Sequence, residues 1–161
     1  MKQEIERKFA IKEMPDLSGK QPIVYERYYL RIEDEIEERI QKKGEKFERE
    51  IKKQLSDLSR TTEKTVLTQD EFEDLKKGAK KSISRDSYMI SNAPDVTIKI
   101  YHGDFEGLVR AEVEFKSEAE ARTFKPLDWM GREISNLPLG KDSSLIQLSN
   151  EEFRVQLELI K

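Results

Sequence analysis

The sequence predicts a single α+β domain over residues 1–161, dominated by antiparallel sheet. Three observations indicate this fold class. Strand-like segments recur along most of the chain, two of them alternate charged and apolar side chains, and three helix-start signals follow strand-like segments or loops. With 161 residues, the chain is long enough for one domain with a core and short for two.

The strands are predicted from β-favouring side chains bounded by turn residues. They are expected at residues 2–11, 25–32, 35–42, 46–53, 60–67, 82–91, 95–102 and 107–116. Lys43, Gly44 and Glu45 predict a hairpin turn between the third and fourth strands. Gly103 and Gly107 separate the last two, so consecutive strands are joined closely enough to pair as neighbours.

Three capping boxes, each a Ser or Thr followed three residues later by Glu, predict helices. They are Thr68 with Glu71, Ser117 with Glu120, and Ser149 with Glu152. The first is expected to open a helix over residues 69–80, and the second a short helix through Phe124. The third should open a C-terminal helix with Phe153 and Leu157 on its apolar stripe.

The first strand carries the earliest indication of chemistry. Successive side chains of a strand point to opposite faces, so Glu4, Glu6 and Lys8 share one face and Ile5 and Phe9 the other. Two carboxylates and an ammonium on one face suit a metal ion and an anionic ligand. Alternating charge on a solvent-facing strand is also common in a chain this rich in charge, and both interpretations stay open at this point.

Residues 110–116 repeat this alternation. Arg110, Glu112 and Glu114 fall on one face, whereas Ala111, Val113 and Phe115 fall on the other. Two such strands, far apart in the sequence, predict that their charged faces line one polar lumen.

The composition argues against several classes of protein, namely nucleic-acid-binding, disulfide-bonded and membrane proteins. Charged residues make up 39% of the chain and the formal net charge is −3 with interspersed signs, which argues against a nucleic-acid partner. The absence of cysteine excludes disulfides, thiolate metal sites and a cysteine nucleophile, and suits a reducing compartment. No apolar run has the length of a membrane span or a signal-peptide core, so we expect a cytoplasmic protein without a membrane partner.

Taken in order, several motifs resemble those of the CYTH family, the triphosphate tunnel metalloenzymes. They are Glu4 to Phe9, a hairpin with Arg39, Gly44 and Lys52, the triplet Leu58-Ser59-Arg60, the strand 111–115 and the segment 124–133. The likeness covers nearly the whole chain. It is nearest to the short bacterial members that include inorganic triphosphatases.

The resemblance implies an eight-stranded antiparallel β-barrel with helices packed on the outside and a lumen that binds a triphosphate. Family members hydrolyse inorganic, thiamine or nucleoside triphosphates, or make cyclic AMP, with Mg²⁺ or Mn²⁺. By motif position, the implied phosphate contacts are Lys8, Arg39, Lys52, Arg60 and Arg85, to which inward parity adds Arg110. The implied metal ligands are Glu4, Glu6, Glu112 and Glu114, and the catalytic set is Glu4, Glu6 and Lys8. Each phosphate-binding cation has a structural ion pair as its alternative role.

Five positions depart from the family pattern. Gln41 stands where a second arginine is usual, Thr62 and Lys64 replace two alternating glutamates, Ser87 replaces a cation, and Lys99 replaces an acid that helps to hold the metal. An ammonium beside Glu112 and Glu114 would repel a divalent cation, so metal affinity is expected to fall.

Three glutamates are expected to compensate in part for these losses. Glu48 and Glu50 share the parity of Lys52 and should therefore point inward. The segment between Lys52 and Arg60 is one residue longer than usual, which suggests a bulge that turns Glu63 toward the lumen.

The favoured function is metal-dependent hydrolysis of a small triphosphate, most simply inorganic tripolyphosphate. The alternative is a CYTH barrel that binds a polyphosphate or phosphorylated ligand without efficient turnover. An adenylyl cyclase is less favoured, since no motif indicates an adenine pocket, and a thiamine triphosphatase is also less favoured. A lumen that is only a salt-bridged polar core is a further alternative. Exposed barrel strands give a mild expectation of a homodimer.

Overall fold

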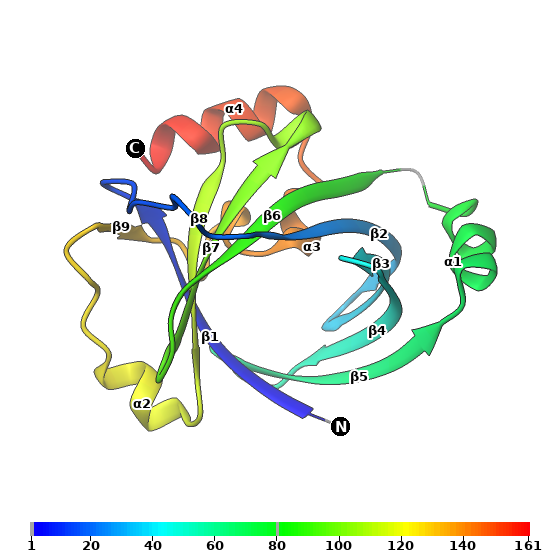
Figure 1. The fold of residues 1–161 in the computed structure, drawn as a ribbon, viewed down its shortest axis with the longest axis horizontal. Coiled ribbons are helices and arrows are strands. Elements are labelled where there is room, and N and C mark those ends of the chain that lie inside the picture. Colours follow the sequence, from blue (N-terminus) through cyan, green and yellow to red (C-terminus); the bar gives the residue numbers. More distant parts are fainter. Residues whose placement is uncertain (1, 80) are drawn as a thin grey trace.

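The structure, a computed structural model, describes residues 2–79 and 81–161 and is built around one antiparallel sheet (Figure 1). The strands are β1 (Lys2–Ile11), β2 (Ile23–Glu33), β3 (Ile36–Lys43), β4 (Lys46–Gln54), β5 (Ser59–Leu67), β6 (Ser82–Ser91), β7 (Asp95–His102), β8 (Val109–Phe115) and β9 (Met130–Glu133). The spatial order is β5-β4-β3-β2-β6-β7-β8-β1-β9, and an additional pairing joins β5 to β1. Strands β1 to β8 therefore close into the predicted eight-stranded barrel.

Strand β1 closes the barrel. Its first half pairs with β5, placing Glu4 opposite Arg60, and its length from Ile5 to Ala10 pairs with β8. The second pairing sets Glu6 opposite Glu114 and Lys8 opposite Glu112. The short β9 adds to the end of β1. The two strands with alternating charge are therefore neighbours, with their charged faces on the same side of the sheet.

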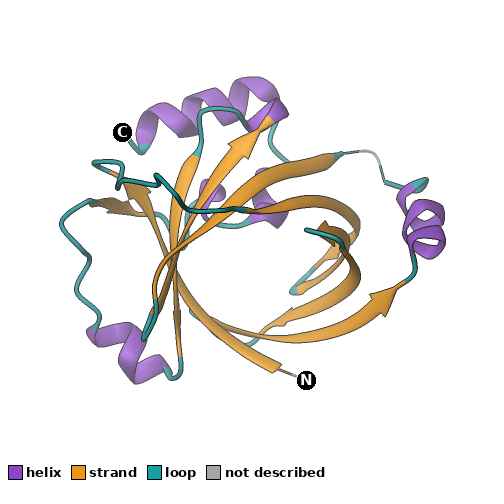
Figure 2. Ribbon diagram, in the orientation of Figure 1, coloured by secondary structure: helices purple, strands orange, loops and turns teal. Residues whose placement is uncertain are grey.

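The helices lie at the edges of the barrel (Figure 2). They are α1 (Gln69–Lys76), α2 (Glu118–Thr123), α3 (Asp142–Leu145) and α4 (Asn150–Leu159), with 3₁₀ turns η1 (Gly103–Phe105) and η2 (Pro138–Gly140). Complete capping boxes start α1 and α4, whereas at α2 the Ser117 hydroxyl accepts from the Glu120 amide. Helix α1 ends before the expected residue 80, which lies outside the described residues, because Gly78 follows and favours a turn.

Apolar side chains fill two layers outside the barrel wall. Ile5, Phe9 and Phe115 pack with Ala121 of α2 in one layer, which β9 also covers. A second cluster places Ile40 of β3 against Phe72 of α1. These layers match the expectation that the barrel turns apolar side chains outward beneath its helices.

One end of the barrel interior is apolar, which differs from the expectation of an interior lined by charge. There, wall side chains such as Ile83 and Leu108 pack against Leu139, Leu145 and Phe153 from η2, α3 and α4. We call this region the closed end. The difference arises because the segment from η2 to α4 folds over the barrel, and this segment carries its own apolar side chains.

Gly140 allows that segment to approach the wall. A Cβ atom at this position would collide with the carbonyl oxygen of Ile134 and lie 2.9 Å from its carbonyl carbon. A residue without a side chain is therefore required where η2 leads into α3.

Candidate functional site

The barrel encloses a cavity of about 290 Å³, the lumen, which holds every site residue predicted from the sequence. Those residues are Glu4, Glu6, Lys8, Arg39, Lys52, Arg60, Arg85, Arg110, Glu112 and Glu114. Among the described residues, eleven lysines and arginines and seven carboxylates line the lumen. The lumen thus carries an excess of positive charge, although the chain as a whole has a formal net charge of −3.

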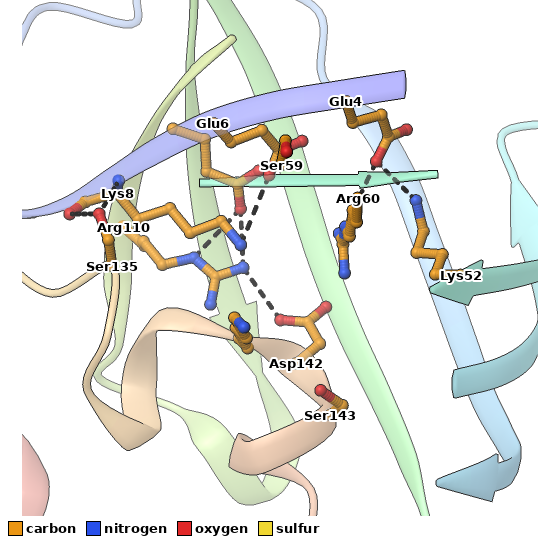
Figure 3. Close-up of polar contacts among 12 residues, drawn as sticks. Glu4, Glu6, Lys8, Lys52, Ser59, Arg60, Arg110, Ser135, Asp142 and Ser143 are labelled. Carbon is orange, nitrogen blue, oxygen red and sulfur yellow. Dashed lines mark hydrogen bonds and ion pairs between the residues drawn. The ribbon is translucent and has the colours of Figure 1, made fainter. Parts of the chain in front are cut away.

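The charged residues of β1 contact cations from three strands (Figure 3). Lys52 Nζ donates to Glu4 Oε2 over 2.7 Å, and Arg60 Nε lies 3.5 Å from the same oxygen. Lys8 Nζ lies 3.4 Å from Glu6 Oε2. Burial acts to raise the pKa of Glu6, but Lys8 and the neighbouring arginine outweigh it and lower the pKa to about 2. Glu6 is therefore ionised across the physiological pH range.

Burial has the opposite effect on the lysines. It lowers the pKa of Lys8 to about 8, against the stabilising charge of Glu6. It also lowers the pKa of Lys52 to about 8, an effect reinforced by Arg39 and Arg60. Both ammonium groups are consequently less costly to deprotonate than a solvated lysine.

The two glutamates of β8 have contrasting surroundings. Glu112 Oε2 accepts from Arg110 Nη2 over 2.7 Å and lies 3.5 Å from Arg85 Nη1, and these cations hold the pKa of Glu112 well below its ordinary value despite burial. Glu114 lies at the open mouth of the lumen with a side chain 42% exposed. Partial burial and the charge of Glu6 raise the pKa of Glu114. Glu114 is thus the most weakly compensated of the four predicted metal ligands.

On the opposite wall, Glu50 holds two of the predicted phosphate-binding cations. Glu50 Oε1 lies 3.4 Å from Arg39 Nη2, and Glu50 Oε2 lies 3.5 Å from Lys52 Nζ. Arg39 also donates to the Tyr29 hydroxyl over 3.2 Å. Glu48 and Glu50 are both buried, as their parity predicted, so carboxylates do enter the lumen wall from β4.

Sequence reasoning missed the most highly connected carboxylate of the lumen. Asp142, at the start of α3, accepts from Arg27 over 2.9 Å and from Arg110 over 3.0 Å, lies 3.0 Å from Arg85, and accepts from the Tyr101 hydroxyl over 2.6 Å. We call these five residues the Asp142 cluster. Its arginines hold the pKa of Asp142 well below its ordinary value, although burial acts to raise it.

Local sequence patterns gave no indication of Asp142, because it lies on a four-residue helix outside any alternating strand. Arg27, in contrast, shares the inward parity of Tyr25 on β2, so strand parity was the available signal for this residue.

The residues that differ from the family pattern form hydrogen bonds and ion pairs with neighbouring side chains of the barrel wall. Gln41 accepts from Arg27 Nε over 2.8 Å and donates to Glu48 over 3.2 Å, and Lys64 lies 3.3 Å from Glu48. Thr62 accepts from Lys52 over 3.0 Å. The loss of charge at Gln41 and Thr62 therefore leaves these side chains hydrogen-bonded within the wall.

Lys99 faces the lumen from β7, opposite Ser87 of β6, and donates to the Ser87 hydroxyl over 2.7 Å. Burial lowers the pKa of Lys99 to about 7, while the charge of Glu112 opposes the shift and those of Arg85 and Arg27 reinforce it.

The expectation for Glu63 was wrong. The pairing of β4 with β5 runs in regular register from Phe47 to Gln54, and Glu63 is exposed. The additional residue is accommodated in the turn between the strands, so no bulge reverses the direction of Glu63.

Carboxylates alone do not form a metal cage here. In residues 2–79 and 81–161, no group of three or more His, Cys, Asp or Glu side chains is arranged to hold a metal ion. Glu6 and Glu114 nevertheless face each other across β1 and β8. Mg²⁺ is commonly held by one or two carboxylates together with the phosphate oxygens of a substrate. The donor set therefore fits a divalent ion that shares its coordination with a phosphorylated ligand.

In the same described ranges, no helix is both long and apolar enough to cross a membrane.

Comparisons with known proteins identify similar chains. A protein of Nitrosomonas europaea named inorganic triphosphatase is 28% identical over 145 residues, which cover 88% of this chain and 95% of that protein. The crystal structure of the inorganic triphosphatase NE1496 matches with a TM-score of 0.67 and 24% identity, covering 90% of this chain and 98% of that one. No family profile matches the sequence.

A putative adenylate cyclase from Bacillus halodurans matches with a TM-score of 0.53 and 17% identity, over 76% of this chain and 86% of that one. These solved structures establish the shared fold. Together with the curated relative, they confirm that the chain resembles the CYTH family and has its closed antiparallel barrel.

Proposed function

We propose that this protein hydrolyses a small triphosphate, most simply inorganic tripolyphosphate, inside the barrel lumen with the help of Mg²⁺ or Mn²⁺. The observation that carries the proposal is the charge of the lumen: eleven cations and seven carboxylates enclose about 290 Å³ in a chain whose formal net charge is negative. Such an enclosed excess of positive charge suits a compact polyanion. The similar chain named inorganic triphosphatase supports the same class of substrate.

The cations would bind and orient the polyanion. Lys8, Arg39, Lys52 and Arg60 come from four different strands and line one cavity, so they can contact successive phosphoryl groups. Arg85 and Arg110 are held by Asp142, which fixes their guanidinium groups at the deep end of the lumen. Fixed cations favour a transition state in which negative charge spreads over the transferred phosphoryl oxygens.

A divalent ion would be held by one or two of the predicted ligands, Glu4, Glu6, Glu112 and Glu114, together with phosphate oxygens, and it would supply positive charge next to the leaving phosphate. Glu6 stays ionised and can orient a water molecule for attack, while Lys8 can hold an oxygen of the attacked phosphoryl group. In the reaction, a water oxygen forms a bond to the terminal phosphorus and the P–O anhydride bond breaks. Orthophosphate and pyrophosphate leave, and the proton of the attacking water passes to a base or to solvent.

The alternative is a barrel that binds a polyphosphate without efficient turnover. One observation favours it: Lys99 places an ammonium where the family has an acid that helps to hold the metal, near Glu112. A cation there opposes the binding of a second cation.

Phosphate release from tripolyphosphate, followed during titration with Mg²⁺ or Mn²⁺, tests the proposal. We expect saturable turnover that Glu6→Gln and Glu114→Gln abolish. Glu63→Gln is the matched control, since it changes an exposed glutamate on the outer face of β5 and should leave turnover unchanged. Tight binding without turnover would favour the alternative. An unmodified protein that neither binds nor hydrolyses tripolyphosphate would overturn both.

A further inference from the structure

Lys99 is a buried cation that faces the lumen. Its side chain belongs to a residue only 6% exposed, and it lines the cavity together with its neighbour Ser87. The ammonium donates one hydrogen bond, to the Ser87 hydroxyl over 2.7 Å. An ammonium has three donors, so the other two are available for a ligand in the lumen.

The pairing of Lys99 differs from that of the other buried lysines of the lumen. Lys52 lies 2.7 Å from a Glu4 oxygen and Lys8 lies 3.4 Å from a Glu6 oxygen. Across the described part of the chain, Lys99 forms no ion pair with a carboxylate under the same distance limit. Burying an ammonium without a carboxylate at ion-pair distance is costly, and the more distant Glu112 offsets this cost only in part, so the arrangement indicates a missing negative partner.

Tyr25 supplies attraction to Lys99 without using its donors. The Lys99 ammonium lies 5.4 Å from the centroid of the Tyr25 ring, and the guanidinium of Arg85 lies 5.1 Å from the same centroid. A cation near an aromatic ring is attracted electrostatically by the ring. The ring therefore attracts both cations, and it does so without occupying the N–H donors of Lys99.

We propose that Lys99, Ser87 and Tyr25 form a phosphate subsite in which the ammonium binds phosphate oxygens directly, so that the lumen binds an inorganic polyphosphate without a metal ion. The subsite rests on the proposed function for the class of ligand. It adds separate roles for two sets of residues: the predicted carboxylate ligands would hold the metal required for hydrolysis, and Lys99 would bind phosphate. The Ser87 hydroxyl orients the ammonium and can itself donate to a phosphate oxygen.

Isothermal titration calorimetry of inorganic tripolyphosphate, performed with and without excess EDTA, tests this subsite. We expect the unmodified protein to bind in EDTA, and Lys99→Gln to weaken that binding by about tenfold or more. Lys99→Arg, which keeps the positive charge, should retain most of the affinity. Lys53→Gln is the matched control, because Lys53 is an exposed lysine on the outer face of the barrel.

Several outcomes would overturn the subsite. The unmodified protein could bind only when Mg²⁺ is present, or Lys99→Gln could bind in EDTA as tightly as the unmodified protein. Thermal melts of each variant show whether a lost affinity reflects lost folding, and Lys99→Met serves as a second neutral variant for that case. A folded neutral variant with unchanged affinity would end the proposal.

The two proposals fail in different ways. Binding in EDTA that depends on Lys99, combined with no phosphate release in Mg²⁺ or Mn²⁺, supports the subsite and refutes hydrolysis. Metal-dependent phosphate release without binding in EDTA supports hydrolysis and refutes the subsite.

Discussion

The Asp142 cluster and Lys99 place buried cations of the same lumen in opposite electrostatic situations. Arg110 is 1% exposed and shares Asp142 with two further arginines at distances of 2.9 to 3.0 Å. Lys99 is 6% exposed and has a serine and an aromatic ring as its neighbours. The cluster also lies next to the apolar closed end, whereas Lys99 lies further toward the mouth.

The difference separates structural cations from available ones. A buried cation with a carboxylate partner is compensated by the fold itself, and its loss leaves the partner uncompensated. A buried cation without such a partner lowers the stability of the free protein, and it is compensated when an anion binds. The parity of a strand does not distinguish these two situations, since both kinds of residue point inward. The side chains that contact each cation distinguish them.

The largest expected effect comes from breaking the Asp142 cluster. Asp142→Asn leaves three buried arginines without their shared carboxylate, and we expect the free energy of unfolding to fall by about 3–5 kcal/mol. Urea unfolding measures this change. Asp57→Asn is the control, because it removes a solvent-exposed pair with Arg122 and should cost less than about 1 kcal/mol. Equal midpoints for the two variants would show that the cluster contributes no special stability.

Gly140→Ala should have the next largest effect. The added methyl group collides with the backbone of Ile134, so η2 and α3 must shift and carry Asp142 with them. We expect a loss of about 1–3 kcal/mol in urea unfolding. Gly78→Ala is the matched control, since its nearest neighbour would be the Leu75 carbonyl oxygen at 3.7 Å. If both variants unfold at the same urea concentration, the closed end does not require a glycine.

Lys99→Met should change stability in the opposite direction. Replacing an unpaired buried ammonium with an apolar side chain of similar length is expected to raise the free energy of unfolding by about 1–3 kcal/mol at neutral pH. Urea unfolding without ligand measures the gain. A destabilised Lys99→Met protein would mean that the ammonium has a compensating partner within the fold.

The pH dependence of that gain is the most specific expectation. Burial lowers the pKa of Lys99 from 10.5 to about 7, so between these values the unfolded chain binds the proton that the folded protein has lost. The cost of Lys99 is therefore greatest below about pH 7, and it declines as the pH rises. The advantage of Lys99→Met should shrink by up to about 1.4 kcal/mol per pH unit from about pH 7 to about pH 9. A constant advantage across this range would contradict the lowered pKa.

Strand alternation predicted much of the barrel from the sequence. Charged and apolar residues alternate with a period of two on β1 and β8, and this pattern predicted which side chains of these two strands enter the lumen. The capping boxes at Thr68 and Ser149 located the starts of α1 and α4. Strand alternation and capping boxes could both be recognised because each depends on residues close together in the sequence.

The rest depends on contacts between distant residues. Asp142 sits on a helix too short to show periodicity, and its partners come from three strands far earlier in the chain. Strand β9 is four residues long and pairs with the edge of β1 that β5 leaves free beyond Ile5. Glu63 was assigned to the wrong face because a longer connection does not reveal whether the additional residue enters the strand or the turn.

The position of β1 in the barrel has a consequence for biosynthesis. Among the strands of the barrel, β1 is synthesised before all others, yet its two neighbours in the barrel, β5 and β8, are complete only after residues 67 and 115. The nascent sheet consequently keeps open edges until β8 emerges, and such edges can pair with other chains. Deleting the first eight residues would leave the edges of β5 and β8 permanently unpaired, so we expect the shortened chain to aggregate rather than to fold as an inactive monomer.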